Sequence, residues 1–270
     1  MKLGIGSYTF AWAVGVPGHE PDRPMTAADL LDTAQTLGVG VVQIADNLPL
    51  HRLAPAEIAS LRDRAVACGL DVEVGTRGIA PDHLRAYLDL AVTFDSPILR
   101  VVTDTADHQP TEDEIVTTVR SLVPTFEEAG VTLAIENHDR FTVAVLVELL
   151  QRIDSERVGI CLDTVNSFGA LEGPARVVET LGPWTVNLHV KDFTITRASH
   201  QMGFAIEGRP AGRGRLDVSW LLSRMRSMDR DVNAILELWT PPEPELADTL
   251  TKERAWAAES VAYLRDLIPN

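Results

Sequence analysis

Three carboxylates and one imidazole stand at corresponding places in four consecutive strand-like runs of this sequence. Glu136 interrupts an apolar run, Asp163 ends the next one, His189 lies in an alternating run, and Glu237 lies in an apolar segment. A buried carboxylate without a partner costs several kcal/mol, so neighbouring strands that each carry such a group require a shared counter-charge. A divalent cation supplies that charge, and we predict that these four residues bind one.

Each of the four residues also has a structural explanation of its own. Asp163 could cap the following helix, His189 could be a hydrogen-bonded core histidine, and either glutamate could pair with an arginine. Four separate explanations would then be needed, whereas one metal ion accounts for all four residues. Three carboxylates and one imidazole suit Mn²⁺ or Mg²⁺, with Co²⁺ or Zn²⁺ as alternatives, and we favour Mn²⁺.

The elements that would position these residues form a regular alternation of eight strand-like runs and eight amphipathic, helix-length stretches. The predicted strands are Leu3–Thr9, Val41–Asn47, Asp71–Arg77, Ile98–Asp104, Thr132–His138, Val158–Asp163, Thr185–Asp192 and Asn233–Thr240. The predicted helices are Thr26–Leu37, Ala54–Cys68, Asp82–Phe94, Glu112–Ala129, Val143–Ile153, Pro174–Leu181, Asp217–Met228 and Leu246–Leu267. The usual C-terminal glycine signal marks four of the helix ends, at Gly38, Gly69, Gly130 and Gly182.

This alternation predicts a single α/β domain over residues 1–270, a (β/α)₈ TIM barrel. An open doubly wound sheet would show the same alternation, but no Gly-x-Gly-x-x-Gly turn follows the first strand. Sites in such barrels lie at the carboxyl ends of the strands, where the predicted ligands stand. The longest connection, Phe193–Leu216, is rich in glycine, and we expect it to be a lid over the barrel mouth.

The net charge of −15 and the isoelectric point near 4.8 repel polyanions, which argues against nucleic acid and anionic membranes as partners, although a local basic pocket is compatible with them. Cys68 and Cys161 form no closely spaced pair, so we expect both to be reduced and structural. Met1-Lys2 leads directly into a strand-like run, and no apolar run reaches the length of a membrane span. We therefore expect a cytoplasmic protein.

Four segments carry a resemblance to a known group of proteins. The chain resembles the xylose-isomerase-like barrel superfamily at Ile135-Glu136-Asn137-His138, Leu162-Asp163-Thr164, Leu188-His189-Val190-Lys191-Asp192 and Leu236-Glu237-Leu238. The superfamily includes sugar epimerases and isomerases, dehydratases, decarboxylases of oxo sugar acids, and endonuclease IV. In its epimerase branch the residues matching Glu136 and Glu237 both bind metal and act as the acid/base pair, so the resemblance implies catalytic roles for these two glutamates.

Two positions bear on the substrate. Many epimerases carry a histidine where this chain has Asn166, whose amide can hydrogen-bond a hydroxyl but does not titrate near neutrality. The segment around Arg215 resembles the place where relatives offer a substrate-binding arginine.

Endonuclease IV needs three zinc ions and more histidines, whereas the corresponding regions here offer Gln43, Asp46, Glu73 and Asn166. With the acidic surface, this argues against DNA cleavage.

Cations near the expected barrel mouth indicate an anionic substrate, because arginine can bind a carboxylate or phosphate through two hydrogen bonds. These cations are Arg77, Lys191, Arg197, Arg209 and Arg215. The alternative is that each pairs with a local carboxylate.

Trp12, in the aromatic first loop, and Trp239 could pack on a sugar, or could plug the barrel or contact another subunit. The substrate-binding candidates are Trp12, Arg77, His138, Asn166, Lys191 and Arg215.

We therefore expect a divalent-metal-dependent isomerase or epimerase of a small keto sugar or sugar acid, acting through a metal-stabilised enediolate. The alternative is a metal-dependent decarboxylase of a 3-oxo sugar acid, because loss of CO₂ gives the same enediolate, and a dehydratase would share the first step. A non-catalytic sugar-binding barrel is a further alternative, but it would give Glu136 and Glu237 no catalytic role. The partner is then a small carbohydrate or sugar acid, and a homodimer or homotetramer is compatible with the exposed aromatic residues.

Overall fold

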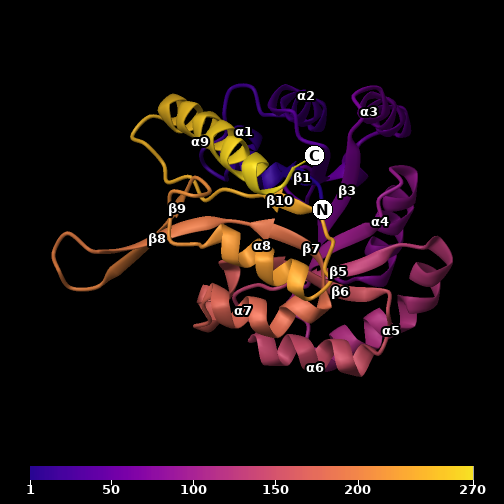
Figure 1. Ribbon diagram of the computed structural model, residues 1–270. Helices are drawn as coiled ribbons and strands as arrows, with labels where there is room; N and C mark the ends of the chain where they lie inside the picture. Colours follow the sequence, from indigo (N-terminus) through magenta and orange to yellow (C-terminus); the bar gives the residue numbers. More distant parts are fainter. Residues whose placement is uncertain (270) are drawn as a thin grey trace.

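The computed structural model describes residues 1–269 and shows a closed barrel of eight parallel strands ringed by helices (Figure 1). The barrel strands are β1 (Leu3–Gly6), β2 (Val41–Ile44), β3 (Asp71–Arg77), β4 (Ile98–Val102), β5 (Thr132–Glu136), β6 (Val158–Asp163), β7 (Thr185–Val190) and β10 (Ala234–Leu236). β10 pairs with both β7 and β1, which closes the sheet. The predicted single-domain (β/α)₈ fold is confirmed.

The helices cover the outside of the barrel and bury their apolar faces against it. They are α1 (Ala11–Val14), α2 (Ala27–Leu37), α3 (Pro55–Ala67), α4 (Pro81–Thr93), α5 (Glu112–Ala129), α6 (Val143–Ile153), α7 (Pro174–Leu181), α8 (Val218–Ser227) and α9 (Leu246–Leu267). Threonine caps begin three of them, because the hydroxyls of Thr26, Thr111 and Thr142 accept backbone N–H groups of the first turn. Among residues 1–269, no helix is long and apolar enough to cross a membrane.

Several barrel strands end earlier than the sequence predicts. β1 stops at Gly6 and the chain continues as a short 3₁₀ helix, Ser7–Phe10, instead of extending to Thr9. β10 covers only three residues, so Glu237 follows the strand directly. Residues that favour extended backbone occur beyond the point where each strand ends. The end of a strand is set by the last backbone hydrogen bond to its neighbours, which the sequence does not show.

The glycines at helix ends differ in conformation. Gly38 and Gly130 cap α2 and α5 in the left-handed region, with φ of 68° and 70°. Gly182 follows α7 but has φ of −49°, so it does not form the expected left-handed cap and begins another short 3₁₀ helix. A Cβ at Gly182 would meet the end of the Met228 side chain, which packs against this glycine.

The segment predicted as one long loop, Phe193–Leu216, contains an ordered hairpin. β8 (Asp192–Arg197) and β9 (Phe204–Arg209) pair antiparallel, continue outward from β7 and project away from the barrel (Figure 1). The glycines that indicated a loop flank or interrupt the strands, so they obscured the strand pattern in the sequence. A lid function for this hairpin stays a proposal.

Asp192 fixes the base of the hairpin. Its buried carboxylate accepts hydrogen bonds from the backbone N–H groups of Gly212 at 3.0 Å, Gly214 at 2.8 Å and Leu216 at 2.9 Å. A Cβ at Gly214 would lie 2.1 Å from Asp192 Oδ1, so this approach requires glycine. The end of the hairpin is thereby held beside the residue that follows Lys191.

The first loop is held by a buried carboxylate on the last helix. Glu253, in α9, accepts hydrogen bonds from the backbone N–H groups of Trp12 at 2.9 Å and Ala13 at 3.0 Å, at the start of α1. Burial raises the pKa of Glu253 to about 7, although both N–H groups favour its ionised form. The contact therefore joins the loop after β1 to the helix that follows β10.

The raised pKa of Glu253 predicts a pH-dependent part of the stability. Between about 4.3, the pKa of an unfolded glutamate, and about 7 in the folded chain, the folded state keeps a proton that the unfolded state releases. This contribution is complete below the unfolded pKa and is lost as the pH rises through 7. Compared with Glu253→Gln, the wild-type chain should lose roughly 2 to 3 kcal/mol of unfolding free energy between about pH 5 and pH 8. Denaturant titrations across this range measure the difference, and a constant difference would contradict the assignment.

Candidate metal centre and active site

The four predicted metal ligands converge at the carboxyl ends of neighbouring strands. Glu136 ends β5, Asp163 ends β6, His189 lies in β7 beside Asp163, and Glu237 follows β10. His189 Nδ1 lies 3.4 Å from Glu136 Oε2, 3.9 Å from Asp163 Oδ2 and 3.3 Å from Glu237 Oε1. All four side chains are buried, so their charges interact with little screening by water.

Three of these side chains offer an atom that makes no hydrogen bond. Within residues 1–269, the buried atoms Asp163 Oδ2, His189 Nδ1 and Glu237 Oε1 have no hydrogen-bond partner, and of these only Asp163 Oδ2 has a cation within ion-pair distance, the Lys191 ammonium at 2.9 Å. These three residues also place ligand atoms within 4.8 Å of one another. Unpaired buried polar atoms are costly, and two carboxylate oxygens beside an imidazole nitrogen suit a divalent cation. The donor set therefore fits a divalent metal at this position.

Asp163 and Glu237 also make protein contacts of the kind that the sequence offered as alternatives to metal binding. Asp163 Oδ1 accepts hydrogen bonds from the backbone N–H groups of Val165 and Asn166, each at 2.8 Å, as an N-cap residue would. Glu237 Oε2 lies 2.8 Å from the ammonium of Lys191. Glu237 thus keeps Oε1 free toward the centre, whereas Asp163 Oδ2 faces the centre and also lies 2.9 Å from the Lys191 ammonium.

Glu136 differs because both of its oxygens are engaged by the protein. Oε2 accepts from the guanidinium of Arg100, and Oε1 accepts from Asn166 Nδ2 at 2.8 Å. Burial would raise the pKa of Glu136, but neighbouring cations, Arg100 foremost, leave that pKa below its usual value. Glu136 is therefore held ionised by a permanent cation.

Arg100 is a functional candidate that the sequence reasoning missed. It lies in β4, is buried, and also forms an ion pair with Asp46, Nη1 to Oδ1 at 2.8 Å. The available signal was a single arginine within the apolar run Ile98–Val102, because an arginine is rarely buried without a partner. Its pairing with Glu136 links the fourth strand to the candidate metal centre.

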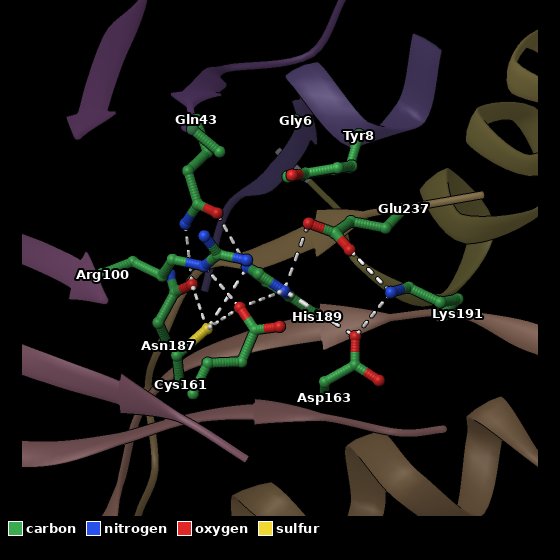
Figure 2. A network of polar contacts seen from close by, with 12 residues as sticks. Gly6, Tyr8, Gln43, Arg100, Cys161, Asp163, Asn187, His189, Lys191 and Glu237 are labelled. Carbon is green, nitrogen blue, oxygen red and sulfur yellow. Dashed lines mark hydrogen bonds and ion pairs between the residues drawn. The ribbon is translucent and has the colours of Figure 1, made fainter. Parts of the chain in front are cut away.

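Lys191 lies within the ligand set. Its buried ammonium is 2.9 Å from Asp163 Oδ2 and 2.8 Å from Glu237 Oε2 (Figure 2). Burial would lower the pKa of Lys191, but Asp163 and Glu237 outweigh it and hold that pKa above its usual value. Lys191 Nζ also donates to Asn166 Oδ1 at 3.4 Å, so the Asn166 amide bridges Lys191 and Glu136.

The two tryptophans have different environments. The ammonium of Lys191 lies 5.5 Å from the ring centre of Trp239, whose side chain is partly exposed. Trp12 donates from Nε1 to the carbonyl oxygen of Thr240 at 2.8 Å, so it fastens the first loop to the segment after Glu237. Trp239 thus forms part of the surroundings of Lys191, while Trp12 contacts the chain beyond it.

Arg77 reaches the centre indirectly. It donates from Nε to Asp46 Oδ2 at 3.1 Å, and Asp46 also accepts from the hydroxyl of Tyr8 at 3.0 Å. Because Asp46 bridges Arg77 and Arg100, the predicted local pairing of Arg77 is present in the structure. Arg77 is partly exposed, and both Asp46 and Arg100 lie between it and Glu136.

Within residues 1–269, His138 and Arg215 form no side-chain hydrogen bond or ion pair with the four ligands. His138 Nδ1 lies 2.5 Å from Asp139 Oδ1, and its side chain is partly exposed. Arg215 is exposed and has no ion-pair partner within residues 1–269, whereas Arg209 pairs with Glu207 at 3.1 Å. The structure therefore joins Asn166 and Lys191 to the ligand set and does not join His138 or Arg215 to it.

Cys161, expected to be structural, lies inside the polar network. Its Sγ is 3.2 Å from His189 Nε2 and 3.3 Å from Asn187 Oδ1. Burial, followed by the charge of Glu136, holds the pKa of the Cys161 thiol well above its usual value. The thiol therefore stays protonated without a metal, while its sulfur lies with Glu136 and His189 in a second group whose ligand atoms are within 4.8 Å of one another.

Comparisons with known proteins agree with this architecture. The family model for the xylose isomerase-like TIM barrel matches residues 31–267. A 3-oxo-isoapionate decarboxylase from Pectobacterium atrosepticum is 36% identical over 264 residues, covering 98% of this chain and 95% of that protein. A D-psicose 3-epimerase structure, determined in the presence of D-fructose, has a TM-score of 0.75 at 16% identity and covers 100% of both chains. A xylose isomerase-like barrel protein from Mycobacterium smegmatis in complex with magnesium has a TM-score of 0.71 at 15% identity, covering 97% of each chain. The structural likenesses show the shared fold.

Arg100→Met should destabilise the chain strongly because it leaves Glu136 and Asp46 without their buried cation. Removal of one partner of a buried ion pair costs about 3 to 5 kcal/mol. Arg77→Met is the matched control, since Arg77 pairs with the same Asp46 but has a side chain that is 34% exposed, against 3% for Arg100. That control should lose less than about 1 kcal/mol. Urea titrations of the metal-free proteins measure both, and equal small losses would contradict the buried-pair assignment.

Proposed function

This chain belongs to the xylose isomerase-like TIM barrel family, and we propose that it is a divalent-metal-dependent decarboxylase of a 3-oxo sugar acid. The decarboxylase was the second interpretation of the sequence, and the geometry of the centre favours it over the isomerase or epimerase. The relative that is 36% identical along nearly the whole chain is a decarboxylase of 3-oxo-isoapionate, a substrate of the same class.

The observation that carries the proposal is that a buried cation is paired with each of the two glutamates. Arg100 holds Glu136, and Lys191 holds Glu237. An isomerase or epimerase needs a carboxylate that removes a proton from carbon, and a carboxylate paired with a permanent cation is a weak base. Decarboxylation needs no such base. It needs positive charge near the carbonyl that receives the electron pair, and Lys191 supplies this charge.

The reaction balances without a further reactant. The bond between the carboxylate carbon and the adjacent carbon breaks, CO₂ leaves, and the electron pair moves through that carbon onto the oxygen of the 3-oxo group. The adjacent carbon then takes up one proton from water or an exchangeable group. Lys191 is placed to stabilise the negative charge that develops, and Asn166 keeps the Lys191 ammonium and the Glu136 carboxylate in a fixed relation.

Asp163, His189 and Glu237 would hold the metal ion, with Glu136 completing the set. When bound, a divalent ion would act as a Lewis acid on the substrate's carbonyl oxygen. Mn²⁺ remains our preferred ion on the composition of the ligand set, with Mg²⁺, Co²⁺ and Zn²⁺ as alternatives. Trp239, which is 37% exposed and whose ring centre lies 5.5 Å from the Lys191 ammonium, offers an aromatic face to a sugar acid.

The isomerase or epimerase is the second candidate. Glu136 and Glu237 come from different strands and both approach His189 Nδ1, at 3.4 Å and 3.3 Å. Two carboxylates placed in this way could act on opposite faces of one substrate carbon, if each were released from its cation. This arrangement is the specific feature that favours the second candidate.

The products distinguish the two candidates. Mn²⁺-loaded protein is incubated in D₂O with a panel of ketoses and a panel of 3-oxo sugar acids, while CO₂ release and deuterium uptake at carbon are followed. We expect one CO₂ for each 3-oxo acid consumed, with one deuterium in the product. A chelated, dialysed sample should release CO₂ no faster than the 3-oxo acid does without protein, and should recover with Mn²⁺ or Mg²⁺.

Deuterium uptake into ketoses without CO₂ would replace the decarboxylase by the isomerase or epimerase. Ligand binding without turnover on either panel would support a non-catalytic sugar-binding barrel. A metal-free protein with full activity would refute the metal requirement in both catalytic candidates.

Lys191→Met should lower the rate of CO₂ release about 100-fold or more, because the developing negative charge loses its cation. Lys191→Arg, which keeps a positive charge, is the matched control and should keep more activity than Lys191→Met. Mn²⁺ binding by Lys191→Met, measured by titration calorimetry, should be retained because the variant removes a cation that competes for Asp163 and Glu237. Wild-type rates in metal-loaded Lys191→Met would contradict this role of Lys191.

A further inference from the structure

A chain of buried amide side chains leads from His189 to Glu73, which takes no part in the steps above. His189 Nε2 lies 2.7 Å from Gln43 Oε1, and Gln43 Nε2 donates to Glu73 Oε2 at 3.1 Å. In Figure 2, Gln43 and Asn187 lie on the opposite side of His189 from Asp163, Lys191 and Glu237. We infer that Glu73 is a positioning residue that fixes, through Gln43, which nitrogen of His189 carries the proton. The inference deepens the proposed metal site and rests on it for its functional meaning.

Glu73 is surrounded by hydrogen-bond donors. Its side chain is buried in the barrel, with 2% of the residue exposed. Oε2 accepts from Asn187 Nδ2 at 2.8 Å as well as from Gln43, and Oε1 accepts from Asn233 Nδ2 at 2.9 Å. All three amides turn their NH₂ groups toward Glu73. Burial raises the pKa of Glu73, but these three hydrogen bonds favour its ionised form, which can only accept.

This constraint fixes the orientation of the Gln43 amide. With its NH₂ group donating to Glu73 Oε2 and to Asn187 Oδ1 at 2.9 Å, the carbonyl oxygen of Gln43 must face His189. A reversed Gln43 amide would place its oxygen against a carboxylate oxygen, which is repulsive. Since an amide oxygen only accepts, His189 Nε2 must be the nitrogen that donates.

The consequence appears on the other side of the imidazole ring. When a neutral histidine carries its proton on Nε2, Nδ1 has a free lone pair. Nδ1 is the nitrogen that faces Glu136, Asp163 and Glu237, and it makes no hydrogen bond within residues 1–269. The contacts of Cys161 agree with these hydrogen-bond directions. Its sulfur can accept from His189 Nε2 while its S–H group donates to Asn187 Oδ1. Glu73 thus keeps Nδ1 available as a metal ligand.

Loss of Glu73 would free the amides to turn together. Asn187 could present its NH₂ group to Gln43, and Gln43 could then present its own NH₂ group to His189 Nε2. The proton of the imidazole would move to Nδ1, where it would point into the ligand set and oppose a cation. Outer groups that orient a metal-binding histidine commonly change metal affinity by about 10- to 100-fold.

The test compares Glu73→Met, which removes the acceptor, with Glu73→Gln, whose carbonyl oxygen can still accept from Gln43 and Asn187. The tautomer of His189 is measured in the metal-free proteins from ¹⁵N chemical shifts, at a pH at which those shifts show a neutral imidazole, because a doubly protonated ring has no tautomer. Mn²⁺ affinity is measured by titration calorimetry. We expect the Nε2–H tautomer in the wild-type chain and in Glu73→Gln. In Glu73→Met we expect a mixture of tautomers and Mn²⁺ binding that is about 10- to 100-fold weaker.

Two controls separate positioning from general loss of stability. Thr185→Val removes another buried polar group of β7, one that bonds to Leu181 and lies outside the amide chain, and it should leave both measurements unchanged. In a Gln43→Leu background, Glu73→Met should cause no further loss of Mn²⁺ affinity, because the connecting amide is already absent.

A folded Glu73→Met protein that keeps the Nε2–H tautomer and wild-type Mn²⁺ affinity would overturn the inference. Equal losses in the presence and absence of Gln43 would overturn the path through Gln43. The tautomer measurement requires neither metal nor substrate, so it stands apart from the proposed function. If the wild-type chain bound no Mn²⁺ while Glu73→Met still shifted the tautomer, the metal proposal would fail and the positioning role would hold.

Discussion

The arrangement of this protein depends on the compensation of buried negative charge at one end of the barrel. Glu136, Asp163 and Glu237 lie around His189 with almost no contact with solvent, and the cations that oppose them are Arg100 and Lys191. Charges removed from water are tolerated only with close partners, because the interior screens them poorly. The strands around the centre therefore have to supply both signs of charge.

The barrel meets this requirement by placing alternate residues of each strand toward its interior. On β7, Asn187 and His189 face inward, and Lys191 follows at the next equivalent position. On β6, Cys161 and Asp163 do the same, in register with Asn187 and His189. The two sides of His189 are thereby distinct: one faces carboxylates and the other faces amides. This separation leaves one nitrogen for a cation and one for the protein.

The same charges bear on the choice between reactions. A centre built for proton removal benefits from a carboxylate that is free to act as a base, whereas here cations hold both glutamates. A centre built to receive an electron pair benefits from cations that cannot easily lose their protons. The decarboxylase proposal follows from this distinction. Further from the centre, hydrogen bonds to Asp192 hold the base of the hairpin, and hydrogen bonds to Glu253 hold the first loop.

The sequence by itself determined the eight barrel strands, the family resemblance and the four residues proposed as ligands. Periodicity and composition are local properties, so they indicate strands, helices and polar residues at strand ends without knowledge of the partners. The tertiary structure alone decided the pairing of Arg100 with Glu136, the position of Lys191 among the ligands, the hairpin within 193–216 and the solvent-facing positions of His138 and Arg215. Gln43 and His189 are 146 positions apart in the chain, and no local pattern relates them. Such contacts arise only when the barrel closes, because closure fixes which inward-facing side chains meet and therefore which charges and hydrogen bonds are satisfied.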